Sequence, residues 1–470
     1  MSDPVPALAE RARDCAAVLR ESDRVLLASH IDADGLTSAA VAALALERAA
    51  IPFEVVFCKQ LDEEEVAAFA NTDYETILFT DFGSGQLPHI KTHADASGFL
   101  PVVCDHHEPA DEDIPHHLNP HLFDIDGSKE LSGAGAAYVL ARALENGTDN
   151  RDLARLAVVG AVGDMQASDG ELHGANAGIV AEGVAAGVLD TGTDLTLYGT
   201  QTRPLPKLLE YAGDVRIPGI TNNASGVREF LEEHDIPVKA GDEWRRWVDL
   251  SQDEKRRLVS GLVRRAVTSG VPADRIDLLT GTTYTLPGED EGTELRDASE
   301  FSTLLNATAR YDRADVGLAV CLGDRNEAYT RAKRLLVNHR RNLSEGIEWV
   351  RSTGTTHEEN IQWFDAGDRI PDTIVGIVAG MALGVSGISA RKPIIAFAEE
   401  SPTETKVSSR GTGRLVGNGL DLSIVMHESA TAVEGEGGGH TIAAGATIPA
   451  GSEAKFLEIA DNIVGEQLNS

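Results

Sequence analysis

The sequence predicts an α/β protein whose first part is a parallel, doubly wound sheet. Apolar runs of strand length occur at residues 24–29, 53–57, 76–80 and 101–104. Helical patterns at 36–50 and 63–70 lie between them, and an amphipathic helix is predicted over residues 1–20. Strands that alternate with helices are typical of a parallel sheet covered by helices. A chain of 470 residues is too long for one core, so we expect two or three domains.

The composition leaves nucleic acid open as a partner despite the strong negative charge. The formal net charge is -34, and only ten of the 41 basic residues are lysines. A protein this acidic would ordinarily repel nucleic acid. The acid is spread evenly over the chain, however, as on the surface of a protein from a high-salt cytoplasm, where charge acts over only a few ångströms. We therefore favour a salt-adapted protein, as found in halophilic archaea.

The sequence indicates neither secretion nor a membrane. The cysteines Cys15, Cys58, Cys104 and Cys321 show no Cys-x-x-Cys pairing, so neither a disulfide framework nor a zinc ribbon is expected. The amino terminus does not have the pattern of a signal peptide. The longest apolar stretch, residues 374–388, is too short to cross a bilayer. We expect a cytoplasmic protein.

Acidic and histidine side chains follow the predicted strands. His30-x-Asp32-x-Asp34-Gly35 follows the first strand and is expected to form an extended loop before the next helix. Asp81 follows the third strand and Asp105-His106-His107 the fourth, and a helical pattern over 153–162 leads to Asp164. The carboxyl ends of neighbouring parallel strands lie about 4.8 Å apart. These side chains can therefore converge on one site, although a single Asp after a strand is more often a turn or cap residue.

The predicted cluster has the ligand types of a divalent metal centre: His30, Asp32, Asp34, Asp81, His106 and Asp164. Four carboxylates carry more negative charge than one divalent ion neutralises, so we expect two ions that share a bridging carboxylate. Such a pair is suited to the attack of water on phosphorus. Phosphoester hydrolysis is the chemistry that this pattern predicts.

These motifs resemble, in order and spacing, those of the DHH phosphoesterase superfamily, which is manganese- or magnesium-dependent. The resemblance implies two Mn²⁺ (or Mg²⁺) ions per active site. It assigns one ion to His30, Asp32 and Asp81, and the other to Asp34, Asp81, His106 and Asp164. It also implies that Asp105 orients an imidazole and that His107 contacts the scissile phosphate. Residues 132–135, Ser-Gly-Ala-Gly, match the family's pattern and would cap a helix over 136–144.

Two later segments extend the resemblance. Asn306-Ala307-x-x-Arg310 looks like a segment of RecJ-type exonucleases and precedes a long helix predicted over 325–350. The basic residues of that helix fit either a solvated connector or a strip facing a nucleic acid backbone. Residues 406–410 and 437–445 resemble the DHHA1 domain, whose glycine run can cradle a phosphate oxygen. We expect the following residues to bind substrate: Asn306, Arg310, Ser409, Arg410, Gly438, Gly439 and His440.

The expected organisation has four segments. Residues 1–202 form the DHH catalytic core, 203–295 an insertion suited to partner docking, and 296–355 the end of the core with the long connecting helix. Residues 356–470 form a smaller α/β DHHA1 domain that binds substrate, and Asp372 or Thr373 caps its first helix.

The resemblance implies a metal-dependent phosphodiesterase, a RecJ-like exonuclease that degrades single-stranded DNA or RNA in DNA repair or replication. Archaeal members of this group resemble a nuclease that associates with the GINS replication complex, so GINS or other replisome proteins are candidate partners. One alternative is a phosphodiesterase of oligonucleotides or cyclic dinucleotides. An alternative of another class is an inactive replisome scaffold, although the intact acidic and histidine motifs argue against it.

Overall fold

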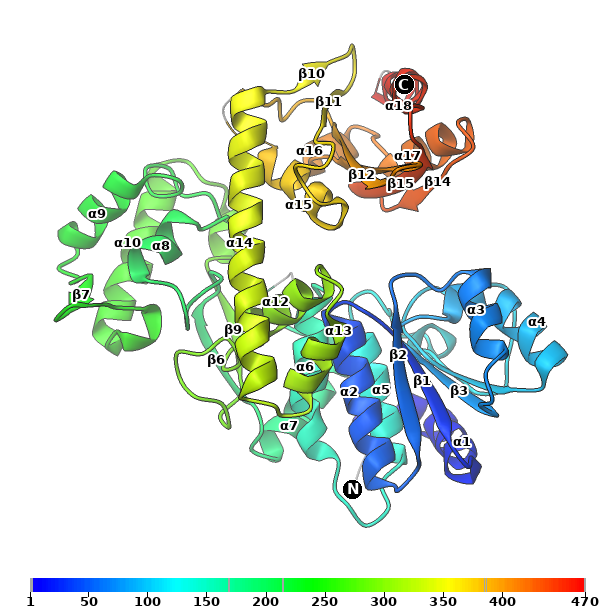
Figure 1. Cartoon of the computed structure of the whole chain (residues 1–470). Coiled ribbons are helices and arrows are strands. Elements are labelled where there is room, and N and C mark those ends of the chain that lie inside the picture. The colour runs from blue at the N-terminus through cyan, green and yellow to red at the C-terminus, as the bar shows by residue number, and fades with distance from the viewer. Residues whose placement is uncertain (1–2, 168–169, 214, 384, 386, 469–470) are drawn as a thin grey trace. The chain divides into compact units, whose positions relative to one another are not determined.

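The computed structural model describes residues 3–167, 170–213, 215–383, 385 and 387–468. The chain consists of two compact units, Met1–Lys333 and Arg334–Ser470 (Figure 1). Among the described residues, no helix combines the length and the apolar character needed to cross a membrane.

The first unit contains the predicted parallel sheet. Its five strands lie in the order β2-β1-β3-β4-β5, and all neighbouring pairs are parallel. The strands are β1 (Val25–His30), β2 (Phe53–Cys58), β3 (Thr76–Thr80), β4 (Leu100–Cys104) and β5 (His117–Leu118). Strands β1 and β3 are almost wholly buried, as expected of central strands with helices on both faces. The four predicted strands are confirmed to within one residue; β5 has only two residues and depends on pairing with β4.

Helices cover both faces of this sheet. Helices α3 (Glu63–Ala70) and α4 (Leu87–Ser97) share one apolar cluster with β1, β3 and β4. Helices α2 (Ala33–Arg48) and α5 (Gly133–Ala143) contact the sheet strands as well as each other. Helix α6 (Ala154–Gly163) packs on α2, α5 and α7 (Gly174–Ala185). The doubly wound α/β fold predicted from the sequence is confirmed.

The first helix is shorter than predicted. Helix α1 spans Ala9–Glu21, and a short 3₁₀ turn, Pro6–Leu8, precedes it. Proline lacks the backbone N–H that a helix interior requires, so Pro4 and Pro6 keep the helix from beginning earlier. Residues 1–2 lie outside the described part of the chain.

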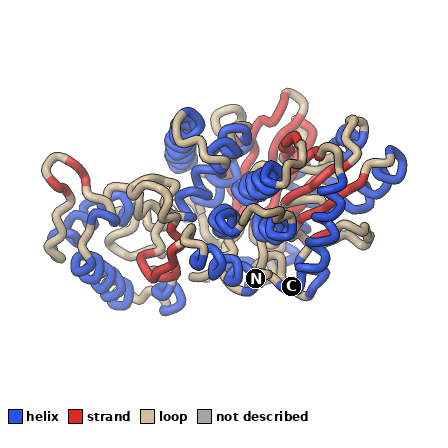
Figure 2. The backbone as a smooth tube through the Cα atoms, turned by 90° about the horizontal axis from the view of Figure 1, so that it is seen from below, coloured by secondary structure: helices blue, strands red, loops and turns tan. Residues whose placement is uncertain are grey.

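The segment between β6 (Asp190–Leu195) and β9 (Thr280–Thr285) has its own core. Buried Phe230, Trp247 and Leu262 belong to this apolar cluster. Helices joined by long loops make up most of the segment, at the left of Figure 2. Its elements are α8 (Leu205–Glu210), α9 (Ala224–Glu233), β7 (Lys239–Ala240), β8 (Glu243–Trp244), α10 (Gln252–Thr268) and α11 (Ala273–Asp277).

Three helices follow β9. Helix α12 (Ala298–Ala309) packs against α6, and α13 (Ala314–Cys321) packs against α2. The long predicted helix is present as α14 (Glu327–Thr353), and the division between the two units falls within it.

The second unit is a six-stranded mixed sheet in the order β10-β11-β12-β13-β15-β14. The strands are β10 (Thr356–His357), β11 (Gln362–Asp365), β12 (Ile394–Ser401), β13 (Glu404–Arg410), β14 (Glu436–Gly439) and β15 (Ala443–Pro449). The helices are α15 (Asp372–Ala382), α16 (Gly413–Gly417), α17 (Leu422–Thr431) and α18 (Glu453–Leu468). The cap predicted for α15 is wrong, because the helix begins at Asp372 and Pro371 holds the cap position without a side-chain hydrogen bond.

Candidate metal centre

The first motif forms the turn between β1 and α2. The buried Ser29 hydroxyl donates hydrogen bonds to the carbonyl oxygens of Gly35 and Thr80, at 2.8 and 3.2 Å. The Asp32 side chain caps α2 by accepting a hydrogen bond from the Gly35 N–H at 3.0 Å. A Cβ atom on Gly35 would lie 2.2 Å from the carbonyl oxygen of His30, so this turn requires glycine. The turn presents His30 and Asp32 together at the carboxyl end of β1.

The sequence suggested that Asp34 belongs to an extended loop, but the structure places it in a helix. Because Asp32 caps α2, the helix begins at Ala33 and Asp34 lies in its first turn. The buried Asp34 carboxylate accepts hydrogen bonds from the N–H groups of Gly133 and Ala134, at 2.7 and 3.0 Å. These donors are the first residues of α5. Two helix amino termini therefore stabilise the charge of one buried carboxylate.

Asp81 lies between two histidines. Its Oδ2 is 3.6 Å from Nδ1 of His30, and its Oδ1 is 3.3 Å from Nε2 of His106. The backbone of Asp81 is left-handed, with φ 60°, directly after β3. Among the described residues, its buried Oδ1 has no hydrogen-bond donor, which is costly for a carboxylate oxygen that nothing else neutralises. A divalent cation would neutralise this carboxylate, so the side chain fits the role of a metal ligand.

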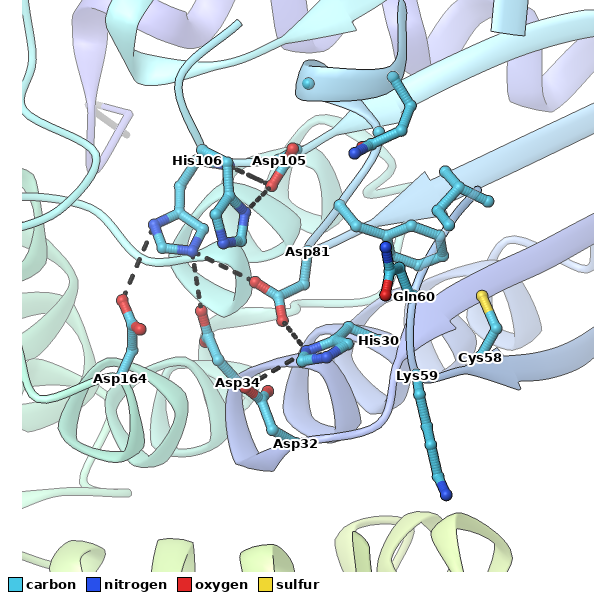
Figure 3. Close-up of a pocket in the computed structure, with 16 residues that line it drawn as sticks. His30, Asp32, Asp34, Cys58, Lys59, Gln60, Asp81, Asp105, His106 and Asp164 are labelled. Carbon is cyan, nitrogen blue, oxygen red and sulfur yellow. Dashed lines mark hydrogen bonds and ion pairs between the residues drawn. The ribbon is translucent and has the colours of Figure 1, made fainter. Parts of the chain in front are cut away.

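A second histidine connects two further carboxylates. His106 Nε2 lies 3.7 Å from Oδ2 of Asp34, and Nδ1 lies 3.8 Å from Oδ2 of Asp164. One ligand atom from each of these three residues lies within 4.8 Å of the others. In a second group, ligand atoms of His30, Asp32 and Asp81 also lie within 4.8 Å of one another. Both groups line a cavity of about 240 Å³, into which these side chains converge (Figure 3).

Asp105 is buried behind the cavity and orients His107. Its Oδ2 accepts a hydrogen bond from the Ser84 N–H at 2.9 Å, and its Oδ1 accepts one from the His106 N–H at 2.7 Å. Nδ1 of His107 lies 2.8 Å from Asp105 Oδ1, and this hydrogen bond raises the pKa of His107. The Asn119 side chain donates to the His107 carbonyl oxygen at 2.8 Å. The His107 ring is therefore fixed at one nitrogen while more than half of its side chain, 57%, is exposed.

The crowded carboxylates change the protonation of the site. Burial opposes charge on His30, yet hydrogen bonds to Asp32 and Asp81 raise its pKa to about 11. Burial and the charge of Asp81 raise the pKa of Asp34. Burial also raises the pKa of Asp164 to about 6, against the opposing effect of His106. The raised pKa values show that the crowded negative charge of the site favours bound protons. A divalent cation would neutralise the same charge in place of those protons, so the residues fit such an ion.

Two predicted substrate residues lie on or beside α12. Oδ1 of Asn306 accepts a hydrogen bond from the Ala33 N–H at 3.0 Å, which supports the turn into α2. Arg310 is exposed at the end of the helix. Burial opposes ionisation of Asp32, but hydrogen bonding to His30 lowers its pKa and the charge of Arg310 adds to this effect. Substrate binding by Asn306 and Arg310 stays a prediction.

The remaining predicted substrate residues lie in the second unit. The buried Ser409 hydroxyl donates to the carbonyl oxygen of Ala444 at 3.1 Å, and Nη1 of Arg410 donates to the Ser409 carbonyl oxygen at 2.8 Å. The glycine run is a strand at the edge of the sheet, paired with β15, because its backbone continues the ladder. Its predicted members are Gly438 and Gly439, which the exposed His440 follows. Their contact with substrate also stays a prediction.

Sequence reasoning missed two residues that support the site. Nε2 of Gln166 donates to Oδ2 of Asp164 at 2.8 Å, and the Gly127 carbonyl oxygen lies 2.7 Å from Nδ1 of His106. Neither residue belongs to a motif. The one available signal was an amide two residues after Asp164. Three further polar side chains that line the cavity were not predicted: Lys59, Gln60 and Gln86.

Three parts of the chain match known domains. Residues 24–161 match the DHH family, N-terminal domain; residues 197–280 match the DHH-CID domain; and residues 361–466 match the DHHA1 domain. An uncharacterized protein of Methanocaldococcus jannaschii is 29% identical over 96% of this chain and 95% of its own length. The single-stranded-DNA-specific exonuclease RecJ of Salmonella typhimurium is 30% identical over 27% of this chain and 23% of its own length.

Solved structures share the fold. RecJ from Thermus thermophilus in complex with Mn²⁺ has a TM-score of 0.60 at 19% identity, over 98% of this chain and 55% of that one. The chain thus spans about half the length of that RecJ. Cdc45 from Entamoeba histolytica has a TM-score of 0.67 at 12% identity, over 97% of this chain and 99% of its own.

The three matching segments and the parallel sheet define an α/β protein of the DHH/DHHA1 class. The chain is thus a RecJ-like DHH/DHHA1 protein, and its DHH-CID match lies between its DHH match and its DHHA1 match. Structures of Thermus thermophilus RecJ contain Mn²⁺ or Mg²⁺. In this chain, the acidic and histidine clusters offer ligand groups for a divalent ion.

Proposed function

We propose that this protein is a metal-dependent phosphodiesterase, a RecJ-like exonuclease that hydrolyses single-stranded DNA or RNA. The observation that carries the proposal is the position of Asp81, whose two oxygens face His30 on one side and His106 on the other. A buried carboxylate between two groups of ligand side chains would suit two cations a few ångströms apart. The predicted ligand set, with two Mn²⁺ (or Mg²⁺) ions, fits this geometry.

Each side chain has a separable task in this proposal. Divalent ions bound there would supply an activated water and charge stabilisation at the phosphorus. Asp34 and Asp81 hold negative charge in a buried place, and Asp105 fixes Nδ1 of His107. The other nitrogen of His107 is then directed to the substrate, where it can donate to a phosphate oxygen. In the reaction, the water oxygen gives up a proton and bonds to phosphorus. The bond to the leaving oxygen breaks, and the leaving oxygen takes up one proton.

The substrate class is inferred from the relatives. RecJ of Salmonella typhimurium is described as specific for single-stranded DNA, and its match covers 27% of this chain. We place the contacts to the nucleic acid backbone at Arg310, Arg410 and the edge strand that contains Gly438 and Gly439. Arginine can contact a phosphate with two hydrogen bonds, and the glycines leave the backbone accessible.

A substrate panel tests this proposal. The protein is incubated at high salt with MnCl₂ and end-labelled single strands, duplexes, dinucleotides and cyclic dinucleotides, with the linear substrates labelled at either end. We expect stepwise shortening of single strands. Preference for dinucleotides or cyclic dinucleotides would favour the second enzymatic alternative, and no cleavage of any substrate with metal bound would contradict hydrolysis.

Substitutions test the metal assignment within the same panel. We expect Asp81→Ala and His106→Ala each to abolish hydrolysis, because each removes a contact shared by the clusters. The matched control Asp95→Ala changes an exposed aspartate on α4 and should retain activity. Circular dichroism checks that each variant is folded. Activity that survives Asp81→Ala would contradict the proposed centre.

The likeness to Cdc45 favours a second candidate, a scaffold that binds replisome proteins without hydrolysis. For the nuclease and for the scaffold alike, we place the partner contact on residues 203–295, which have their own core. GINS is the first partner to test. Deleting that segment should abolish partner binding and leave the ligand groups of the first sheet in place. A protein that captures a partner but cleaves nothing in the panel would be such a scaffold.

A further inference from the structure

A buried glutamine follows the last predicted metal ligand. Helix α6 ends at Gly163, and Met165 is left-handed with φ 63°. The Met165 N–H donates to the Val162 carbonyl oxygen at 3.2 Å, and the Gln166 N–H donates to the Ala161 carbonyl oxygen at 3.0 Å. This pair of bonds closes many helices, and the residue in the place of Gln166 is then commonly apolar and packs back on the helix. Here it is an amide with only 5% of its surface exposed.

All the polar atoms of the Gln166 side chain are engaged. Its Nε2 donates to the Gly127 carbonyl oxygen and to Oδ2 of Asp164, both at 2.8 Å. Its Oε1 accepts a hydrogen bond from the buried Asn176 side chain at 2.6 Å. The Gly127 carbonyl oxygen can only accept, so it fixes which end of the Gln166 amide carries nitrogen, and Oε1 then faces Asn176.

The Gly127 carbonyl oxygen connects this amide to His106. It lies 2.7 Å from Nδ1 of His106, so Nδ1 carries a proton and Nε2 is the nitrogen that faces the carboxylates. A Cβ atom on Gly127 would lie 1.9 Å from the carbonyl oxygen of His106, so this close approach requires glycine. One side chain, Gln166, thereby supports both His106 and Asp164.

We propose that Gln166 is a positioning residue for the cation held by Asp34, His106 and Asp164. Through the Gly127 carbonyl oxygen it selects the ring nitrogen with which His106 binds the ion. Its direct bond to Oδ2 of Asp164 would hold that carboxylate in place beside His106. This inference rests on the proposed metal centre, but not on the substrate that the centre cleaves. Substitution of a residue in this supporting position commonly lowers metal affinity about 10- to 100-fold.

Calorimetric titration of the full chain with MnCl₂ tests the inference. Gln166→Met keeps the length of the side chain and removes its hydrogen bonds. We expect this variant to raise one Mn²⁺ dissociation constant about 10- to 100-fold. The dissociation constant of the ion assigned to His30, Asp32 and Asp81 should change by no more than about twofold. The matched control Gln201→Met changes a buried glutamine that does not line this cavity and whose Oε1 accepts a hydrogen bond from the Gly292 N–H at 3.0 Å. Both constants should stay unchanged in this variant.

A double-mutant cycle with Asp164→Ala separates positioning from general destabilisation. If Gln166 acts on the same ion, the double variant should bind that ion little more weakly than Asp164→Ala alone. Full additivity, an equal loss at both ions, or unchanged constants in folded Gln166→Met would overturn the inference. If Gln166→Met does not fold, Asn176→Leu tests it, because it frees Oε1 and lets the amide rotate; unchanged Mn²⁺ affinity there would again overturn it. Wild-type protein that binds Mn²⁺ but cleaves no substrate would refute the proposed activity alone.

Discussion

Replacing Gly133 by alanine should disable the metal centre without harming the helix that contains it. A Cβ atom at Gly133 would lie 2.3 Å from Oδ1 of Asp81, whereas ordinary contact begins at 3.4 Å. The carboxylate must therefore move by about 1 Å, and a misplacement of that size at a reacting centre can cost about 100-fold in rate. That factor corresponds to about 2.7 kcal/mol of lost transition-state stabilisation. Alanine is itself the better helix former, so the loss would not come from α5.

The assay is the rate of single-strand hydrolysis at saturating MnCl₂, together with the Mn²⁺ dissociation constants and the melting temperature. Gly413→Ala is the matched control, because Gly413 is likewise the first residue of a capped helix and its Cβ would meet nothing within 4 Å. We expect the control to retain its rate. Full activity and metal affinity in folded Gly133→Ala would refute the view that Asp81 must occupy its present position.

Three further predictions concern other parts of the site and fold. His107→Gln should lower kcat about 100-fold or more while Mn²⁺ affinity holds, since His107 is expected to contact phosphate; an unchanged kcat would contradict that role. Arg410→Ala should raise KM about tenfold with kcat largely retained, as expected for the loss of a charged hydrogen bond to phosphate, and an unchanged KM would argue against it. Burial lowers the pKa of His117 from 6.5 to about 4, and its ring is bonded to the Ser84 hydroxyl at 2.9 Å. The folded state therefore disfavours protonation, so stability is full above pH 6.5 and falls as the pH drops towards 4. Between pH 7 and pH 5, protonation linked to this group should lower the free energy of unfolding by about 2 kcal/mol, as measured by urea titration. In His117→Gln the free energy of unfolding should fall by about 2 kcal/mol less over the same pH range, and an equal fall in both proteins would contradict the assignment.

Local patterns predicted most of the fold. The four longer strands of the first sheet appear where apolar runs lie between helical patterns. The Ser132 cap is also present, accepting a hydrogen bond from the Gly135 N–H at 3.1 Å. Each of these features depends on residues close together in the chain. The two-residue strand β5 was not predictable, because it exists only by pairing with β4.

The candidate site was predicted as a set of residues but not as an arrangement. The sequence placed Asp34 in a loop, whereas the structure places it in a helix where the N–H groups of Gly133 and Ala134 hold it. Gln166 has no motif, and its importance depends on a carbonyl group 39 residues earlier in the chain. Such partners cannot be inferred from spacing, because packing alone brings them together.

The sequence by itself determined the ligand chemistry and the end of each strand at which it would lie. Strand polarity and residue type are local properties, and a parallel sheet aligns the ends of its strands. The tertiary structure decided which oxygen of Asp81 faces which histidine and which imidazole Asp105 orients. Those choices depend on ångström-scale distances between segments far apart in the chain, and the dense packing of helices on the sheet fixes them.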